Sequence, residues 1–328
     1  MKEFVISKNE AGQRFDKYIA KRLPHATTGF IYKMLRKKNF VVNAKKADGK
    51  EILKTGDVIR FYLSDETYEK FAKTEGSSSA SKELSLPDDL NVIYEDDDIL
   101  IFSKPAGMLS QKASQDDVSL NEYLISYLVK EGKITKEELE TFRPSVCNRL
   151  DRNTSGLILC GKSLSGSQYL SRIIKDHSLE KYYRTIVLGR LTEHILLEGY
   201  MTKDEAANKV SLSRTRPKEG EAAYLKTEVW PERFAMFHGQ EYTLCKVKIY
   251  TGKSHQIRAQ LADRGFPLAG DGKYMGKRKD PLSEEIKNRY QILHAYRVVF
   301  PNDDRYRGME VVCDDSKILD KALWMLGE

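Results

Sequence analysis

The chain has 328 residues, 40% of them hydrophobic, which is enough for two domains with sizeable cores. It contains no apolar run near the ~18 residues that a membrane-spanning helix needs, and its N-terminus lacks the apolar region of a signal peptide. The formal net charge is +7, and residues 1–60 alone hold 15 Lys and Arg against 6 Asp and Glu. The basic surplus therefore lies entirely in the first sixty residues, as expected for a segment that binds a polyanion.

Cysteine and histidine usage bears on the compartment and on metals. The four cysteines form no CxxC pair, so we expect small, mostly buried side chains in a protein of the reducing cytoplasm. The six histidines form no HxxxH or HExxH pair, and we therefore expect neither a metal nor another cofactor. We also expect a monomer that does not bind membranes.

Residues 12–63 are predicted to form a compact α/β module. A first helix is indicated by apolar residues at helical spacing, namely Phe15, Tyr18, Ile19 and Leu23. Pro24 ends this helix, and Thr27 or Thr28 is placed to cap a second one. The buried stripe of the second helix is expected to consist of Ile31, Met34 and Leu35. Short strands are predicted at 40–42 and 58–63.

The second helix turns a row of cations toward solvent. A charge run on a helix is often only a solvated face. Here, however, no acidic residue occurs between Arg22 and Lys46, and a surface of one sign repels itself unless phosphates neutralise it. We predict that RNA binds to Arg22, Lys33, Arg36, Lys37, Lys38, Lys45 and Lys46.

The order of these elements, with the sequences RFDKYIAKRL and KTGDVIRFYL, resembles the small RNA-binding domain shared with the small-subunit ribosomal protein S-four. The resemblance implies binding to structured RNA through its backbone and shape. We place this domain at 1–63 and a flexible linker at 64–87, where residues 74–81 are nearly devoid of apolar side chains. The domain is therefore expected to move freely relative to the rest of the chain.

A globular composition returns at residue 88 and continues to the end of the chain. Strands are predicted at 91–95, 99–102, 157–160, 181–189 and 242–250. Helical spacing is found at 119–139, 165–177 and 317–326, and a further helix is predicted to begin near Ser254. The polar segment 201–220 is expected to be an exposed hairpin or loop.

The stretch NRLDRNTSGLILCGKS, residues 148–163, carries a single carboxylate between two guanidinium groups. This residue, Asp151, lies between Arg149 and Arg152, just before a small polar turn and a buried strand. Neighbouring positive charge stabilises the ionised form of a carboxylate, and a loop leading into a core strand is a rigid support. Taken alone, the triplet is equally the pattern of a surface ion pair.

The same stretch resembles the HRLDRxTSGL signature of the RluA-type pseudouridine synthases, with Asn148 in place of the usual His. Four further stretches resemble motifs of that family: KPAG at 104–107, KYY at 181–183, GKSHQIR at 252–258, and PLAGD at 267–271 with LHA at 293–295. Gln111 and Gln260 also replace a usual His. We hypothesise that Asn148 and Gln111 are a paired change, with their side chains at most one water apart.

The resemblance implies a site for isomerising uridine. In this family the C1′–N1 bond breaks, the base turns, and C5 joins C1′, after the target has left the helical stack. The implied catalytic residues are Asp151, Arg258 as its partner, and Tyr183 against the base, with Asp151 either attacking C1′ or removing a sugar proton. The implied substrate-binding residues are Arg149, which would fill the gap left by the base, Arg152, Thr154, Lys181, Lys253, His255, Gln256 and Leu293.

We therefore predict an α+β protein. A small basic α/β domain and a linker precede a catalytic domain at 88–328, built on a mixed, mostly antiparallel sheet with flanking helices and a central cleft. Asp151 is expected at the floor of that cleft.

The predicted function is the isomerisation of specific uridines in large-subunit ribosomal RNA, because the family members with such an N-terminal domain more commonly modify ribosomal RNA. The alternatives are a transfer-RNA pseudouridine synthase and a non-catalytic RNA-binding or ribosome-assembly protein, which would leave Asp151, Tyr183 and Arg258 unexplained. A metal-dependent RNA hydrolase would need clustered carboxylates or histidines, which the sequence lacks.

Overall fold

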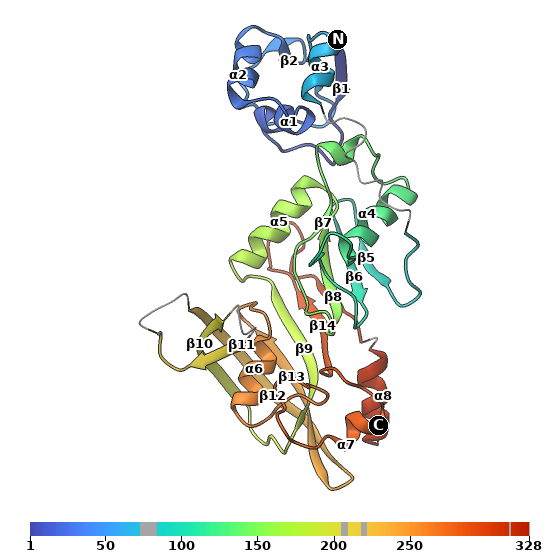
Figure 1. Ribbon diagram of the computed structural model, residues 1–328, viewed down its shortest axis with the longest axis vertical. Helices are drawn as coiled ribbons and strands as arrows, with labels where there is room; N and C mark the ends of the chain where they lie inside the picture. The colour runs from blue at the N-terminus through green and yellow to red at the C-terminus, as the bar shows by residue number, and fades with distance from the viewer. Residues whose placement is uncertain (73–83, 205–208, 218–221, 315, 328) are drawn as a thin grey trace.

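The computed structural model describes residues 1–72, 84–204, 209–217, 222–314 and 316–327. Figure 1 shows a small N-terminal module standing at one end of a larger catalytic part. Each contains one β-sheet, with four strands in the module and eleven in the catalytic part. Residues 74–81, predicted to belong to a flexible linker, lie outside the described residues. No helix among the described residues is long and apolar enough to cross a bilayer.

The N-terminal module packs three helices against its sheet. The strands follow the order β1 (Lys2–Val5), β4 (Val58–Phe61), β2 (Phe40–Val42) and β3 (Lys45–Lys46), all antiparallel. The helices are α1 (Phe15–Arg22), α2 (Thr28–Arg36) and α3 (Asp65–Phe71). Thr27 caps α2 by accepting from the backbone N–H of Phe30, at 3.2 Å. The predicted apolar stripes of α1 and α2 are buried in a core of the module's own.

Helix α3 corrects the predicted start of the linker at residue 64. Ser64 caps this helix by accepting from the N–H of Thr67, and Tyr68 and Phe71 pack against the module's core. The rings of Phe71 and Phe30 are 4.4 Å apart. The charged residues between these two aromatic side chains hide the short apolar stripe in the sequence, so ordered structure reaches further than predicted.

The catalytic part is built on a mixed, mostly antiparallel sheet, as predicted. Its order is β11 (Lys209–Ser213), β10 (Ile195–Asp204), β12 (Ala223–Phe237), β13 (Gln240–Ile249), β9 (Glu180–Leu188), β14 (Leu293–Val299), β8 (Ser155–Gly161), β6 (Ile99–Lys104) and β5 (Asn91–Glu95). Two short strands lie off this path, β15 (Glu310–Val312) beside β14 and β7 (Ser145–Val146) beside β8. The polar segment 201–220 contributes to the β10–β11 hairpin, as expected.

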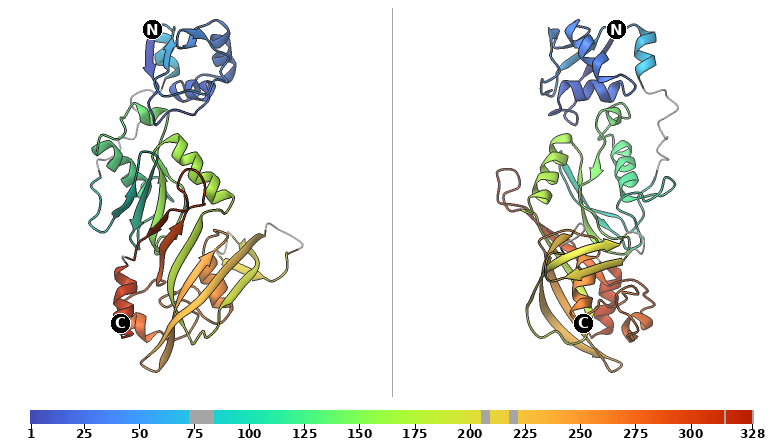
Figure 2. Two further views of the ribbon diagram at one scale, coloured as in Figure 1. Left: turned by 180° about the vertical axis from the view of Figure 1, so that it is seen from behind. Right: turned by 60° about the vertical axis from the view of Figure 1, so that its left-hand side comes forward.

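Helices cover both faces of the sheet, and the right-hand view of Figure 2 shows α4 (Leu120–Lys130) and α5 (Leu164–Lys175) on opposite sides. Residues of β6 and β8 alternate between these sides. Phe102 and Ile158 join the core under α4, whereas Ile101 and Leu159 join the core under α5. The remaining helices are α6 (Gln256–Asp263), α7 (Pro281–Glu285), α8 (Lys317–Met325) and the 3₁₀ turn η1 (Glu138–Glu140).

A parallel contact between β8 and β14 joins distant parts of the chain. Ser155 pairs with His294 and Gly156 with Ala295. Gly156 has a φ of +116°, and a Cβ at this position would lie 2.2 Å from the carbonyl oxygen of Ala295. Only glycine fits here, because β14 occupies the space that a side chain would need. This contact places the end of the Asp151 loop directly beside β14.

Candidate active site

Asp151 lies in the loop between β7 and β8, and Asn148 fastens the start of this loop. The side-chain amide of Asn148 donates to the carbonyl of Leu157 at 3.3 Å and accepts from the N–H of Leu159 at 2.7 Å. These two bonds replace those that another residue of β7 would make, so the chain leaves the sheet three residues before Asp151. Gln111 is exposed and makes no hydrogen bond with Asn148 or with other described residues. The hypothesis of a paired change therefore finds no support.

The loop after β6 holds the Asp151 loop from the other side. The hydroxyl of Ser110 donates to the carbonyl of Leu150 at 3.0 Å and accepts from its N–H at 3.1 Å. The backbone N–H of Gly107 donates to the carbonyl of Arg152 at 2.9 Å, and the Arg152 Nε donates back to the Gly107 carbonyl at 3.0 Å. Both neighbours of Asp151 are therefore tied to the KPAG loop.

Lys104 is a supporting residue that the sequence analysis placed in a motif without giving it a role. Its side chain is fully buried, and its Nζ donates to the carbonyls of Pro105, Met108 and Arg152 at 2.8, 2.9 and 3.1 Å. Burial lowers the pKa of Lys104 to about 7, although the negative charge of Asp151 opposes this shift. The ammonium group thus bridges the two loops close to the carboxylate.

Arg258, on α6, lies between two carboxylates. Its Nη1 is 3.4 Å from the Asp151 Oδ2, so the predicted contact is present. Its stronger partner is Asp271, which accepts from Nε at 2.7 Å and from Nη2 at 2.8 Å. Asp271 is fully buried, and the sequence analysis gave it no role beyond its place in the PLAGD turn. Asp271 therefore fixes the guanidinium, and a free edge of that guanidinium faces Asp151.

Tyr183 lies on the side of β9 that faces the same core as Val247 and Leu293. Burial, and then the negative charge of Asp151, raise the pKa of its phenol. The hydroxyl therefore stays neutral, and the ring lies close enough to Asp151 to feel its charge. The structure thus brings Asp151, Tyr183 and Arg258 together, from the loop before β8, from β9 and from α6.

His255 completes the surroundings of Asp151. It precedes α6 in a left-handed conformation, with a φ of +60°. Its Nε2 is 3.8 Å from the Asp151 Oδ2, and its Nδ1 is 2.9 Å from the hydroxyl of Tyr274. Burial lowers the pKa of His255, so its ring is neutral at pH 7 and the contact with Asp151 is not an ion pair. The Tyr274 ring also lies 5.2 Å from the Arg258 guanidinium carbon.

Several predicted substrate-binding residues have side chains turned toward solvent or toward the Asp151 site. Arg149, Arg152 and Lys253 are exposed, and His255 is half-buried beside Asp151. Lys181 lies two residues before Tyr183 on the same strand, is nearly buried, and makes no hydrogen bond or ion pair with the described residues. Burial lowers its pKa.

Gln256 and Thr154 correct the prediction, because the protein itself occupies their polar atoms. The Gln256 amide donates to the carbonyl of Lys226 and to the hydroxyl of Thr227, while its oxygen accepts from the N–H of Lys253. Thr154 is 2% exposed, and its hydroxyl accepts from the side chain of Gln291. Both residues brace the site from inside and are not open to a substrate. Leu293 is likewise part of the core that contains Tyr183.

In the N-terminal module, six of the seven residues predicted to bind RNA are exposed: Lys33, Arg36, Lys37, Lys38, Lys45 and Lys46. The prediction for Arg22 is wrong. Its side chain is buried, and its guanidinium donates to the carboxylate of Glu140, 118 residues further along the chain. A phosphate cannot reach it there.

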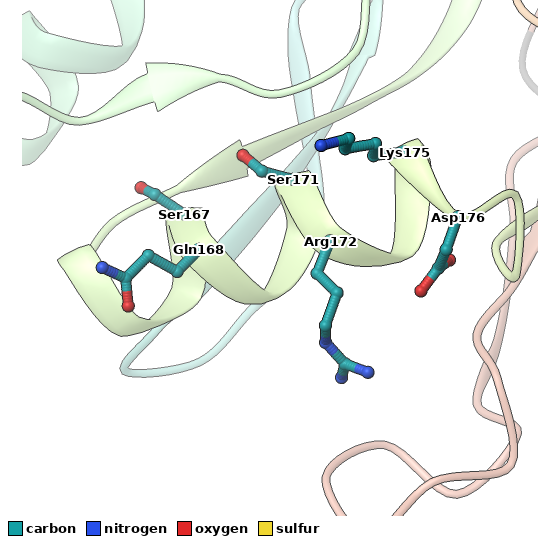
Figure 3. Close-up of a pocket in the computed structure, with 6 residues that line it drawn as sticks. All are labelled: Ser167, Gln168, Ser171, Arg172, Lys175 and Asp176. Atoms are coloured by element: carbon teal, nitrogen blue, oxygen red, sulfur yellow. The ribbon is translucent and has the colours of Figure 1, made fainter.

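Two hollows occur elsewhere on the catalytic part. An open groove of about 630 Å³ follows the outer side of α5 (Figure 3), lined by Ser167, Gln168, Ser171, Arg172, Lys175 and Asp176. A second, of about 350 Å³, lies between α6 and the β10–β11 hairpin. Asp151 lines neither, so the cleft expected around it stays a prediction.

Comparison with known proteins agrees with this geometry. Residues 98–263, half of the chain, match the sequence model of the RNA pseudouridylate synthase family. The chain belongs to this family. It is an RNA pseudouridine synthase, an isomerase that converts uridine to pseudouridine in RNA.

Full-length relatives and solved structures are similar as well. The Vibrio vulnificus protein named ribosomal large subunit pseudouridine synthase C is 26% identical over 326 residues, covering 98% of this chain and 95% of the relative. The Borreliella burgdorferi protein named ribosomal large subunit pseudouridine synthase D is 29% identical over 301 residues, covering 90% and 84%. The structure of human RNA pseudouridylate synthase domain containing 4 is similar in fold, with a TM-score of 0.57 at 16% identity, covering 72% of this chain and 92% of that one.

Proposed function

We propose that this enzyme isomerises uridines of large-subunit ribosomal RNA in the cytoplasm. Support comes from the relatives that carry this substrate in their names and match nearly the whole chain. The basic N-terminal module supports it too, because the exposed cations of α2 and β3 suit a structured, polyanionic partner. We propose that this module, at 1–63 in the sequence, is an S-four-type RNA-binding domain.

The observation that carries the proposal is a single reachable carboxylate held beside a fixed guanidinium. The Asp151 side chain is 26% exposed, whereas that of Arg258 is 9% exposed and bound bidentately by Asp271. A substrate can therefore meet Asp151, while Arg258 keeps its position without rearrangement. Preorganised charges of this kind stabilise the charge that develops during reaction.

In the proposed reaction, the target nucleotide leaves its helix and its base lies against the neutral ring of Tyr183. Asp151, as a carboxylate, attacks C1′ or removes a sugar proton, and the C1′–N1 bond breaks. The freed base turns, and C5 joins C1′. Arg258 holds the carboxylate, and the exposed guanidinium of Arg149 takes the place that the base vacated.

The proposal is tested by incubating the purified chain with transcripts of large-subunit ribosomal RNA and of transfer RNAs. Pseudouridines are then mapped by carbodiimide-dependent stops in primer extension. We expect new stops in the large-subunit transcript with the wild type. We expect none with Asp151→Asn, because the neutral amide cannot act as nucleophile or base.

Two comparisons make the result interpretable. Asp304→Asn removes the same charge from an exposed position and should leave the stops unchanged. Binding of Asp151→Asn to the same transcript should remain, because the module's cations are untouched. Stops confined to the transfer RNAs would refute the ribosomal assignment, and stops that persist in Asp151→Asn would refute the role of Asp151.

A further inference from the structure

The loop that follows β1 docks the N-terminal module onto the catalytic part. Figure 1 shows the module at the end of the catalytic part that carries α4 and α5. The backbone carbonyl of Asn9 accepts from the N–H of Leu164, at the start of α5, at 3.2 Å. The side-chain amide of Asn9 donates to the carbonyl of Lys133 at 3.2 Å, and Lys8 forms an ion pair with Asp97. One short loop therefore contacts three separate segments of the catalytic part.

A buried charged cluster lies behind this loop. The guanidinium of Arg22 donates to Glu140 at 2.7 Å, to Glu10 at 3.4 Å and, through Nε, to the hydroxyl of Tyr18 at 3.2 Å. The hydroxyl of Thr141 donates to Glu10 as well. Glu10 is 2% exposed, Thr141 is 1% exposed, and the Arg22 side chain is 7% exposed. Glu140 and Thr141 belong to the catalytic part, so the cluster spans the interface.

Such a cluster selects one docked arrangement. A buried ionised group is tolerated only where its hydrogen-bonding atoms are matched, and a shift of the module would leave Glu10 or Arg22 buried without a partner. Apolar contacts would permit sliding, but charged pairs with directional bonds do not. The free movement expected from the sequence is thus opposed by specific contacts.

We propose that this interdomain cluster fixes the distance between the cations of α2 and the Asp151 site, so that the enzyme selects its uridine partly by spacing. The preferred substrate is then a folded RNA in which the element bound by the module and the target uridine stand at one set separation. This inference rests on the proposed function, since it assumes that α2 binds RNA. It adds the rule by which the bound RNA is positioned.

The cluster is disrupted from the catalytic side with the double variant Glu140→Ala, Thr141→Val, because the half-exposed Glu140 and the adjacent Thr141 lie outside both the module's core and the Asp151 site. Small-angle X-ray scattering is expected to show a larger maximum dimension for this variant than for the wild type. Asp97→Asn is the matched control, since it removes an exposed ion pair of the same interface and should leave the scattering unchanged. Scattering of the double variant identical to that of the wild type would overturn the proposal.

The spacing rule is tested with RNAs that carry two or four extra base pairs between the module's footprint and the target uridine. The wild type is expected to lose about tenfold or more in kcat/KM on the lengthened RNAs. The double variant should lose about twofold or less on the same lengthening, while starting from a lower value on the native spacing. Equal losses in both proteins would overturn the proposal. If instead the wild type forms no pseudouridine in any RNA, the proposed function fails before the spacing rule is reached.

Discussion

Lys104 is held where its charge is costly, and its partners explain why that charge persists. Three carbonyl oxygens accept from its Nζ, and a protonated amine has three N–H bonds to give. The neutral amine has only two, so deprotonation leaves one of these buried carbonyls without a partner. The Asp151 loop is therefore best held in the protonated state, even though burial lowers the pKa of Lys104 to about 7.

This predicts a pH dependence that a lysine would not ordinarily produce. As the pH rises through about 7, Lys104 loses its proton, one bond between the two loops is lost, and the cation near Asp151 disappears. The single-turnover rate of pseudouridine formation should therefore fall between pH 6 and 8 as the pH rises through about 7. Lys104→Met should be slower throughout and should lack this step. A wild-type rate that stays constant across that range would contradict the prediction.

Individual residues also show where sequence reasoning ends. Arg22 and Lys33 are both cations on helices of the same basic module, yet Lys33 is exposed and Arg22 is buried against Glu140. The pairing of Arg258 with Asp151 was expected from the family motif, but its firmer pairing with Asp271 was not. Local patterns report which residue types are present, whereas such pairings depend on how distant segments meet.

At the scale of elements, alternation predicted the central strands well. In β13, Thr243, Cys245, Val247 and Ile249 share the buried face that their spacing indicated. Helix α3 was missed because two aromatic residues among charged neighbours make a weak apolar stripe. Strand β1 was missed because it has only four residues and gains its order from pairing with β4, more than fifty positions away.

The contact between β8 and β14 makes a prediction at the same scale. Gly156→Ala should destabilise the catalytic part by about 3 kcal/mol, because the new methyl group would meet the backbone of Ala295 in a left-handed conformation. Urea unfolding followed by tryptophan fluorescence measures this, since both tryptophans, Trp230 and Trp324, belong to the catalytic part.

Gly29→Ala serves as the comparison, because it adds a methyl group to α2, where the nearest atom is 4.0 Å away. It should leave this unfolding midpoint unchanged. An equal midpoint for Gly156→Ala and the wild type would mean that β14 can move away from β8.

For the whole molecule, charge is divided between a basic module that binds and a nearly neutral remainder that reacts. The double variant Lys33→Ala, Arg36→Ala should reduce the slope of log affinity against log salt by about two, one for each phosphate contact removed. Turnover at saturating RNA should be unchanged, since neither residue is near Asp151. Lys130→Ala, an exposed lysine at the end of α4, should leave the slope as it is. A slope that is the same in all three proteins would place the RNA elsewhere.

The pairing of Ser155 with His294 has a consequence for how the enzyme matures during its synthesis. These two positions are 139 residues apart, and Arg258 and Asp271 also follow Asp151 by more than a hundred. Bringing such remote segments together is slow compared with forming the compact N-terminal module, which is translated first. A nascent chain still on the ribosome can thus fold the part that grips RNA well before it owns a competent carboxylate. Capture precedes chemistry in the life of each molecule as well as in each turnover.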